Sequence, residues 1–397
     1  MTTQLSDLSL QGQRVLVRVD FNVPLDADGN VTSDARIRES LPTIRAILEA
    51  GGRPVLMAHL GRPKGKVVDS MRVLPAARRL AELLGSPVET VDNCVGDEVV
   101  AASRALADGS CLMLENLRFH AAEEQGDAEF ARALAENGDV FVGDAFGAAH
   151  RAHASVSGVP QLLPSAAGLL MQRELTAFGK VLTDPERPFV AILGGAKVSD
   201  KLPVIKNLLP KVDALIIGGA MAYTFLRQQG LEVGKSLVEQ DLLGAAGEVC
   251  AQAEESGKQL LLPVDHICAA EFAADSPAST HVGSIPDGLM GLDIGPQSVE
   301  RFCAVIESAR TVVWNGPMGV FEMDAFCRGT EAVAHAVAKA CAAGAFTVVG
   351  GGDSVAAAEK TGVAGRLSHV STGGGASLEL LEGKQLPGVA ALGSSNS

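Results

Sequence analysis

The sequence predicts an α/β protein with two doubly wound, Rossmann-like parallel-sheet domains joined by a helix and a hinge. Its 397 residues are too many for one comfortable hydrophobic core. Short β-branched runs alternate with amphipathic stretches, which is typical of strand–helix repeats. The runs are almost continuously apolar, as expected for parallel strands that are covered on both faces.

Nine candidate strands follow from these runs. In the first half they are residues 14–19, 54–58, 111–114 and 140–143, and in the second half residues 188–193, 214–217, 259–263, 311–314 and 346–349. Helical patterns such as residues 74–84 and 332–343 lie between them. This alternation predicts one parallel sheet in each half of the chain.

We expect the division between the domains near residue 165. Pro160 and Pro164 interrupt the chain, and residues 166–181 then have a helical pattern. We therefore assign residues 1–165 to an N-terminal domain. Residues 166–385, the connecting helix included, form the C-terminal domain.

Composition and charge exclude several classes of protein. The net charge of −14 argues against a nucleic-acid partner held by a basic surface. Seven scattered cysteines without a C-x-x-C pair favour a reducing compartment over a disulfide framework. No apolar run approaches the roughly 18 residues that span a membrane, and the first ten residues lack a signal-peptide pattern. We expect a cytoplasmic protein without membrane or nucleic-acid partners.

Polar and basic side chains follow the strands of the first half. Those at or near the strand ends, with one arginine from the segment after the first strand, are Asp20, Asn22, Arg36, His59, Arg62, Arg118 and Arg151. Asp20 and Asn22 alone are better explained as turn caps, by about two to one. Several arginines at one sheet edge, however, repel one another unless an anion lies among them. We therefore expect this edge to bind a small molecule that carries phosphate and carboxylate groups.

Glycine turns follow the strands of the second half. Gly194 and Gly195 precede Lys197 and Lys201, whose i, i+4 spacing would let both face one ligand at a helix N-terminus. Similar turns lie at residues 218–219, 350–354 and 373–375. Asp353 can hold Mg²⁺ directly or through water, because Mg²⁺ prefers few carboxylates plus substrate phosphates. The bare amides of the last turn suit a transferring phosphoryl group.

Two other motifs carry little weight. Residues 230–236 resemble a P-loop, but one residue is missing between the glycines and a helical pattern precedes them instead of a strand. His150 and His153 lack a Cys or Glu partner at metal-binding spacing, so polar roles beside Arg151 are the better interpretation.

Eight segments together resemble the phosphoglycerate kinase family, in the family's order and across essentially the whole chain. They are RVDFNVP at 18–24, HLGRP at 59–63, LENLRFH at 114–120, AHRAHAS at 149–155, LGGAKVSDK at 193–201, VVWNGPMGVFE at 312–322, GGGDS at 350–354 and STGGGASLELLEGKQLPG at 371–388. The resemblance implies a phosphotransferase that moves a phosphoryl group reversibly between 1,3-bisphosphoglycerate and Mg-ADP, giving 3-phosphoglycerate and ATP. It further implies direct in-line transfer after domain closure, Mg²⁺ as cofactor, and a monomer whose residues 386–397 return to the first domain.

The same resemblance implies the site residues. Substrate would be bound by Asp20, Phe21, Asn22, Arg36, His59, Leu60, Gly61, Arg62, Arg118 and Arg151. Nucleotide would be bound by Gly194, Lys197, Lys201, Gly218, Gly219, Gly291, Asn315, Pro317, Glu322, Gly351, Gly352, Asp353 and Ser354. Arg36, Lys197, Gly373 and Gly374 would act on the transferring group, and Asp353 would hold the metal.

Two alternative functions fit the sequence less well. A catalytically inactive nucleotide-binding scaffold of the same fold should lack transfer residues, whereas Arg36, Lys197, Asp353 and the turn at Gly373 are present. A nicotinamide-dependent dehydrogenase needs a G-x-G-x-x-G turn after the first strand, where this chain has Asp-Phe-Asn-Val-Pro.

Overall fold

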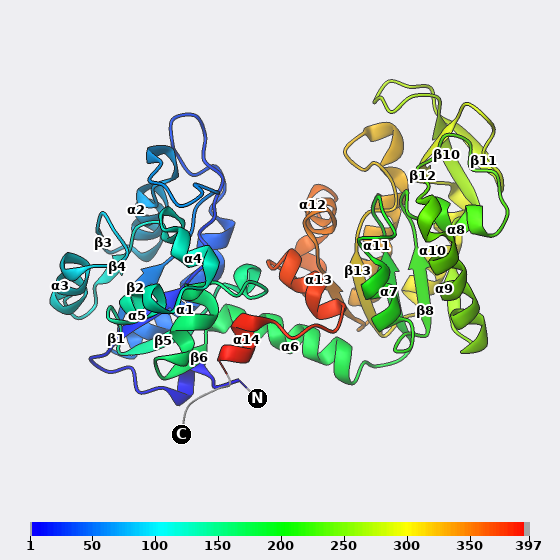
Figure 1. The fold of residues 1–397 in the computed structure, drawn as a ribbon. Coiled ribbons are helices and arrows are strands. Elements are labelled where there is room, and N and C mark those ends of the chain that lie inside the picture. Colours follow the sequence, from blue (N-terminus) through cyan, green and yellow to red (C-terminus); the bar gives the residue numbers. More distant parts are fainter. Residues whose placement is uncertain (1, 393–397) are drawn as a thin grey trace. The chain divides into compact units, whose positions relative to one another are not determined.

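The computed structural model describes residues 2–392 (Figure 1). The chain divides into two compact units. Unit 1 consists of Met1–Thr176 with Gln385–Ser397, and unit 2 of Ala177–Lys384. No helix in the described part of the chain combines the length and apolar character needed to cross a membrane.

Unit 1 contains a six-stranded parallel sheet in the order β3-β4-β2-β1-β5-β6. Its strands are β1 (Arg14–Arg18), β2 (Arg53–Met57), β3 (Val88–Thr90), β4 (Cys111–Met113), β5 (Val140–Gly143) and β6 (Ser165–Ala167). Its helices include α1 (Ala35–Glu49), α2 (Leu74–Leu84), α3 (Asp97–Ala105), α4 (Ala121–Gln125), α5 (Ala128–Ala135) and α14 (Pro387–Ala391). Val15, Leu16 and Val17 of β1 are all fully buried, so both faces of this strand are covered.

Unit 2 repeats this plan with a second six-stranded parallel sheet, ordered β15-β14-β13-β7-β8-β9. Its strands are β7 (Phe189–Leu193), β8 (Ala214–Ile217), β9 (Gln259–Leu261), β13 (Thr311–Asn315), β14 (Phe346–Val349) and β15 (His369–Val370). The helices include α7 (Leu202–Leu208), α8 (Ala222–Gln228), α9 (Leu243–Glu255), α10 (Pro296–Glu307), α11 (Arg328–Ala342), α12 (Gly352–Lys360) and α13 (Gly375–Leu381). Trp314 of β13 is fully buried in one core with Phe302 of α10 and Val333 of α11.

The predicted α/β fold and all nine predicted strands are confirmed. Three short parallel strands, β3, β6 and β15, were missed. So was a three-stranded antiparallel sheet in unit 2, ordered β11-β10-β12 and made of β10 (Asp265–Ala269), β11 (Ser279–Val282) and β12 (Met290–Ile294). Short or partly polar strands lack the continuous apolar run on which the prediction relied.

The connecting helix begins later than predicted. Residues 165–167 form β6, which pairs with β5, so α6 runs from Leu169 to Thr183. The two units divide inside α6, between Thr176 and Ala177, and not at residue 165. At the other end of the chain, the backbone N–H of Gly388 donates to the carbonyl of Ala149 at 2.9 Å, within unit 1. Residues 393–397 of the predicted tail lie outside the described residues.

A buried carboxylate caps α6. One oxygen of Asp144, just after β5, accepts the backbone N–H of Leu170 at 3.0 Å. Burial raises the pKa of Asp144 to about 7. Because this folded pKa lies above the unfolded value of about 4, the folded state binds the proton more tightly, and stability falls as pH rises from about 4 to 7.

Asp144→Asn is therefore expected to flatten the pH dependence of stability in that window, by up to about 1.4 kcal/mol per pH unit. Urea unfolding followed by circular dichroism at pH 5 and pH 7 measures this slope. Asp28→Asn, which changes an exposed carboxylate of the same unit, is the control. An unchanged slope in Asp144→Asn would show that Asp144 ionises with an ordinary pKa.

Candidate functional site

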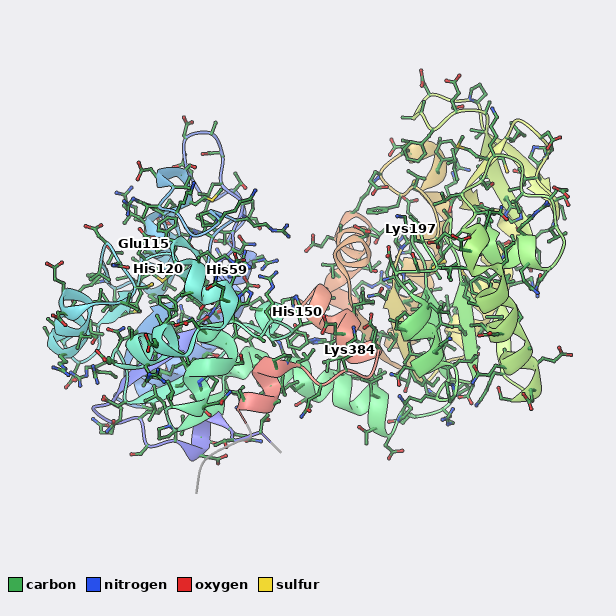
Figure 2. The ribbon with its side chains drawn as sticks, viewed as in Figure 1. His59, Glu115, His120, His150, Lys197 and Lys384 are labelled. Atoms are coloured by element: carbon green, nitrogen blue, oxygen red, sulfur yellow. The ribbon has the colours of Figure 1, made fainter. Side chains whose placement is uncertain are left out.

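Four neighbouring strands of unit 1 deliver the predicted substrate side chains to one edge. The order β4-β2-β1-β5 is parallel throughout, so the carboxyl ends of these strands meet. His59 and Arg118 follow β2 and β4 and are only 3% and 5% exposed. Figure 2 places His59 in this unit. Parallel pairing thus explains why residues far apart in sequence gather at one place.

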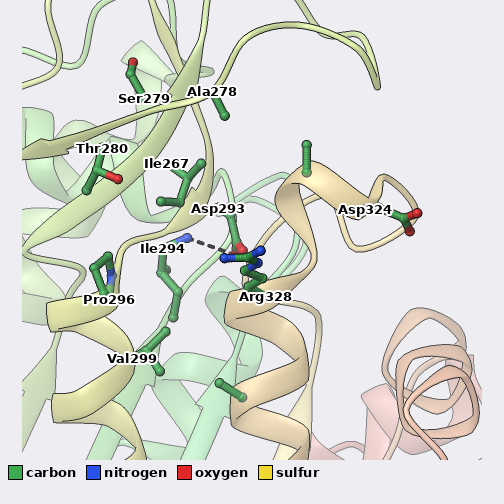
Figure 3. A pocket seen from close by; sticks show the side chains of 12 residues that line it. Ile267, Ala278, Ser279, Thr280, Asp293, Ile294, Pro296, Val299, Asp324 and Arg328 are labelled. Carbon is green, nitrogen blue, oxygen red and sulfur yellow. Dashed lines mark hydrogen bonds between the residues drawn. The ribbon is translucent and has the colours of Figure 1, made fainter.

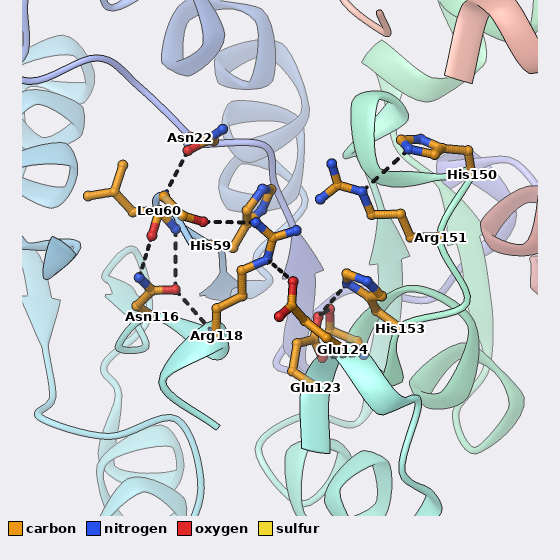
Figure 4. Close-up of polar contacts among 12 residues, drawn as sticks. Asn22, His59, Leu60, Asn116, Arg118, Glu123, Glu124, His150, Arg151 and His153 are labelled. Atoms are coloured by element: carbon orange, nitrogen blue, oxygen red, sulfur yellow. Dashed lines mark hydrogen bonds and ion pairs between the residues drawn. The ribbon is translucent and has the colours of Figure 1, made fainter. Parts of the chain in front are cut away.

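A cluster of buried cations lies at this edge (Figure 4). Arg118 donates through Nη1 to the carbonyl of Gly61 at 2.8 Å, and its Nε lies 3.2 Å from Glu124. Burial lowers the pKa of Arg118, and the nearby charge of Arg151 lowers it further. Nη1 of Arg151 is buried without a hydrogen-bonding partner in the described part of the chain. Such crowding of cations favours an anionic ligand.

Polar contacts hold the loops around this cluster. Asp20 forms an ion pair with Arg36. The side-chain oxygen of Asn22 accepts the backbone N–H of Gly61 at 2.9 Å. Asn116 accepts the backbone N–H of Arg118 at 3.1 Å and donates to the carbonyl of Leu60 at 2.8 Å. Asn116 was not predicted as a site residue, although it lies two residues after the predicted strand 111–114.

The remaining predicted substrate residues differ in exposure. Arg62 is exposed at the surface. Phe21 and Leu60 are 0% and 4% exposed and belong to the hydrophobic core. The side chains of these two residues are therefore not available to a ligand. Arg18, at the end of β1, is 2% exposed and contacts His59, but sequence reasoning did not assign it a role.

Unit 2 contains a pocket of about 460 Å³ with a mainly apolar lining, which we call the apolar pocket. Five residues that were predicted to bind the nucleotide line it: Gly219, Gly291, Pro317, Glu322 and Asp353. Sequence reasoning missed others, including Tyr223, Lys235, Ser236, Leu237, Phe272 and Met290. Lys235 and Ser236 belong to the P-loop-like segment 230–236, whose glycine-bounded turn is the signal in the sequence that could have identified them.

Several glycines of this region make room for protein neighbours. A Cβ atom on Gly194 would lie 2.0 Å from the carbonyl oxygen of Pro317, and one on Gly291 would lie 1.9 Å from the hydroxyl of Tyr223. A Cβ atom on Gly218 would lie 2.3 Å from the sulfur of Met318. All three glycines were predicted to bind the nucleotide. The structure shows close approach to neighbouring loops and side chains.

A smaller hollow of about 260 Å³ adjoins the apolar pocket, and we call it the glycine hollow. It is lined by Lys201, Asn315, Gly316, Gly351, Gly352, Asp353, Ser354, Gly374, Gly375 and Leu378. Lys201 donates to Asn315, whose amide donates to the carbonyl of Gly350 at 2.8 Å. Burial lowers the pKa of Lys201. Asp353 lines both cavities.

The other predicted transfer residues of unit 2 lie in loops. Lys197, labelled in Figure 2, is exposed, and α7 begins only at Leu202. The helical i, i+4 argument that paired Lys197 with Lys201 was therefore wrong. The backbone N–H of Gly373 donates to the hydroxyl of Ser371 at 3.1 Å, whereas Gly374 lines the glycine hollow.

A further cavity of about 620 Å³ lies elsewhere in unit 2 and contains no predicted site residue (Figure 3). It shares β12 with the apolar pocket, because Gly291 lines the pocket whereas Asp293 and Ile294 line this cavity. Asp293 is 1% exposed and accepts the backbone N–H of Gly329, at the start of α11, at 2.7 Å. Its carboxylate therefore serves the packing of α11.

The surroundings of Asp353 fit a metal that is held mainly by a ligand. Within residues 2–392, no group of three His, Cys, Asp or Glu side chains is placed to hold a metal ion. Asp353 is an exposed carboxylate in the first turn of α12. Mg²⁺ takes one or two carboxylates and completes its shell with water and substrate phosphates. The donor set therefore suits Mg²⁺ that arrives with phosphates.

Two α/β units, each built on a parallel sheet, are typical of a nucleotide-dependent phosphotransferase when one carries clustered cations and the other carries cavities lined by lysines. The phosphoglycerate kinase family model matches residues 5–384. The chain is 61% identical over 389 residues to the phosphoglycerate kinase of Moorella thermoacetica, covering 98% of both. It is 57% identical to that of Acaryochloris marina, covering 98% of this chain and 97% of the relative. The solved structure of phosphoglycerate kinase from Coxiella burnetii has a TM-score of 0.90 at 40% identity, covering 99% of both chains.

The chain belongs to the phosphoglycerate kinase family. It is a glycolytic, ATP-binding transferase, and the phosphoryl group that it moves passes between 1,3-bisphosphoglycerate and ADP. The dehydrogenase alternative is wrong.

Proposed function

We propose that unit 1 binds 3-phosphoglycerate or 1,3-bisphosphoglycerate and that unit 2 binds the magnesium nucleotide. The observation that carries the first assignment is the unpartnered, buried Nη1 of Arg151 beside Arg118 and His59. A phosphate or carboxylate oxygen would satisfy this donor and relieve the repulsion among the cations. Arg62 and the main chain near Phe21, Leu60 and Gly61 complete the proposed substrate site.

For the nucleotide, the apolar pocket suits a planar base, and the glycine hollow suits phosphates. Glu322 and Lys201 line the two cavities, respectively, so we assign Glu322 to the ribose and Lys201 to the phosphates. Asp353 lies where the cavities adjoin and would hold Mg²⁺ there. When bound, Mg²⁺ neutralises phosphate charge.

Transfer from an acyl phosphate to ADP needs no covalent intermediate on the protein, so the catalytic task is positioning and charge stabilisation. We assign Arg36 to the substrate side of the transferring group and Lys197 to the nucleotide side. The amides of Gly373 and Gly374 complete the cradle. The Gly373 amide must first leave Ser371.

Because the two ligands are assigned to separate units, direct transfer requires the units to approach each other. Such closure also excludes water, which would hydrolyse the acyl phosphate. Positioning of this kind is worth about 7–11 kcal/mol of barrier. We further propose that the protein is cytoplasmic and acts as a monomer. Light scattering at working concentration would check the oligomeric state.

A coupled assay with ATP, Mg²⁺ and 3-phosphoglycerate, read through the dehydrogenase that consumes 1,3-bisphosphoglycerate, tests the function. We expect turnover that EDTA abolishes and added Mg²⁺ restores. Mg²⁺ added back to the coupling enzyme alone is the control. Folded protein that binds both ligands without turnover would instead support the inactive-scaffold alternative.

A further inference from the structure

A chain of four buried polar residues lies at the proposed substrate site (Figure 4 shows part of it). Glu123 and Ser155 are fully buried, Arg18 is 2% exposed and His59 is 3% exposed. They come from four different segments: α4, the short helix η5 (Ala154–Gly158), β1 and the loop after β2. Burial of this many polar groups is costly unless each hydrogen bond is made, so the contacts among them constrain one another.

The direction of every hydrogen bond in the chain is set by chemistry. Arg18 donates through Nη2 to Nδ1 of His59 at 3.0 Å and through Nε to the hydroxyl of Ser155 at 2.9 Å. The Ser155 hydroxyl donates to Glu123 at 2.6 Å, and the Ser155 backbone N–H donates to the other oxygen of Glu123 at 2.9 Å. A guanidinium cannot accept, so both bonds of Arg18 have a fixed direction, and the two oxygens of Glu123 accept the backbone N–H and the hydroxyl of Ser155.

It follows that Nδ1 of His59 accepts, and the ring proton of neutral His59 lies on Nε2. Protonation of Nδ1 would place two N–H groups against each other. Nε2 has no hydrogen-bonding partner within residues 2–392 and is not among the buried unsatisfied atoms. His59 therefore offers one donor, on Nε2.

The charges around His59 also favour the neutral imidazole. Burial lowers its pKa well below the usual range, and the guanidiniums of Arg18, Arg118, Arg151 and Arg36 lower it further. The carboxylate of Glu123 lies on the far side of Ser155, where it balances the charge of Arg18. His153, whose Nδ1 lies 3.8 Å from Glu123, is also surrounded by these cations, and burial and these charges lower its pKa to about 4.

We propose that the chain Glu123–Ser155–Arg18 locks His59 as the neutral Nε2–H tautomer, and that this N–H donates to an oxygen of the three-carbon phosphate substrate. Arg18, Ser155 and Glu123 are positioning residues, because they act through His59. This inference rests on the proposed function for its substrate half alone, since the tautomer is a property of the free protein.

Nitrogen-15 NMR of the full chain labelled at histidine tests the tautomer without substrate. The protein has eight histidines, and the His59→Gln spectrum identifies the signals of His59. We expect a neutral ring protonated at Nε2 from pH 5.5 to 8.5. Protonation at Nδ1, or titration of the ring between pH 6 and 7, would overturn the proposal.

Ser155→Ala and Glu123→Gln test whether the hydrogen bonds from Glu123 through Ser155 to Arg18 position His59. Each is expected to mix the tautomers of His59 and to raise KM for 3-phosphoglycerate about tenfold, with KM for ATP unchanged. Ser157→Ala is the matched control, because Ser157 lies on the same short helix and its hydroxyl, within residues 2–392, bonds only to the carbonyl of His153. Circular dichroism melting shows whether a variant is folded, and the wild-type NMR result stands in either case.

The two halves of the proposal fail differently. A folded Ser155→Ala protein with an unchanged His59 tautomer would overturn the positioning chain while leaving the proposed function intact. If His59→Ala binds 3-phosphoglycerate as tightly as wild type, the donor role falls together with the assignment of His59 to the substrate site. His59→Gln, whose amide can replace Nε2–H, should lose less affinity than His59→Asn.

Discussion

Arg36→Ala is expected to lower kcat by about 10³- to 10⁵-fold and to leave nucleotide affinity unchanged. Arg36 lies in the first turn of α1, and its side chain is 42% exposed although it forms an ion pair with Asp20. A guanidinium that is held through Nη1 by a buried carboxylate, with 42% of its side chain exposed, can meet charge that develops on a transferring phosphoryl group. The affinity for nucleotide should not change because the nucleotide site is assigned to unit 2.

Steady-state kinetics in both directions, with calorimetric titration of ADP, measures the effect of Arg36→Ala. Arg38→Ala is the matched control, because Arg38 lies on the same helix, is 54% exposed and pairs with Asp34 at the surface. The control should keep near-normal turnover. If Arg36→Ala also retains near-full turnover, the transferring group is stabilised by other residues, and the role assigned to Arg36 is wrong.

The sheets could be predicted from sequence because parallel strands buried on both faces are continuously apolar. Val15, Leu16 and Val17 show this pattern without interruption. The antiparallel strands β10 and β11 do not, because β11 is largely exposed and β10 carries buried Asp265 and His266. Their pairing depends on contacts distant in sequence, which the local pattern does not contain.

The site could be predicted as far as strand ends determine it. Parallel order brings His59 and Arg118 together, and the prediction used that rule. Arg18 was missed because it is the last residue of a strand that otherwise reads as core. The helix expected around Lys197 was misplaced, although Pro203, one residue after Leu202, marks the first turn of α7.

The glycines show a different limit of sequence reasoning. A glycine permits another group to approach the backbone closely, but the local sequence does not say which group approaches. At Gly194 the neighbour is the carbonyl oxygen of Pro317, and at Gly291 it is the hydroxyl of Tyr223. Gly291, Tyr223 and Pro317 line the apolar pocket, so these close contacts pack its walls. Contact with a nucleotide remains a prediction for them.

Asp353→Ala is expected to raise the Mg²⁺ concentration that the reaction needs. Among the described residues, Asp353 is the carboxylate that lines both the apolar pocket and the glycine hollow, and it is exposed to an incoming ligand. A metal that neutralises phosphate charge is worth several kcal/mol in the transition state. We therefore expect about a hundredfold loss of kcat/KM at limiting Mg²⁺, which is about 3 kcal/mol. Part of the activity should return at saturating Mg²⁺, because the nucleotide phosphates still bind the metal.

A Mg²⁺ titration of the coupled assay at fixed ATP measures this shift. Glu359→Ala is the matched control, because it removes an exposed carboxylate from the same helix, α12, outside both cavities. The half-saturating Mg²⁺ concentration should rise in Asp353→Ala and stay constant in the control. Asp353→Asn, which keeps one oxygen ligand but not the charge, should lie between them. If Asp353→Ala and wild type respond identically to Mg²⁺, then the nucleotide and solvent hold the metal without this carboxylate. The acidic residue at the start of α12 would then serve to favour the helix N-terminus.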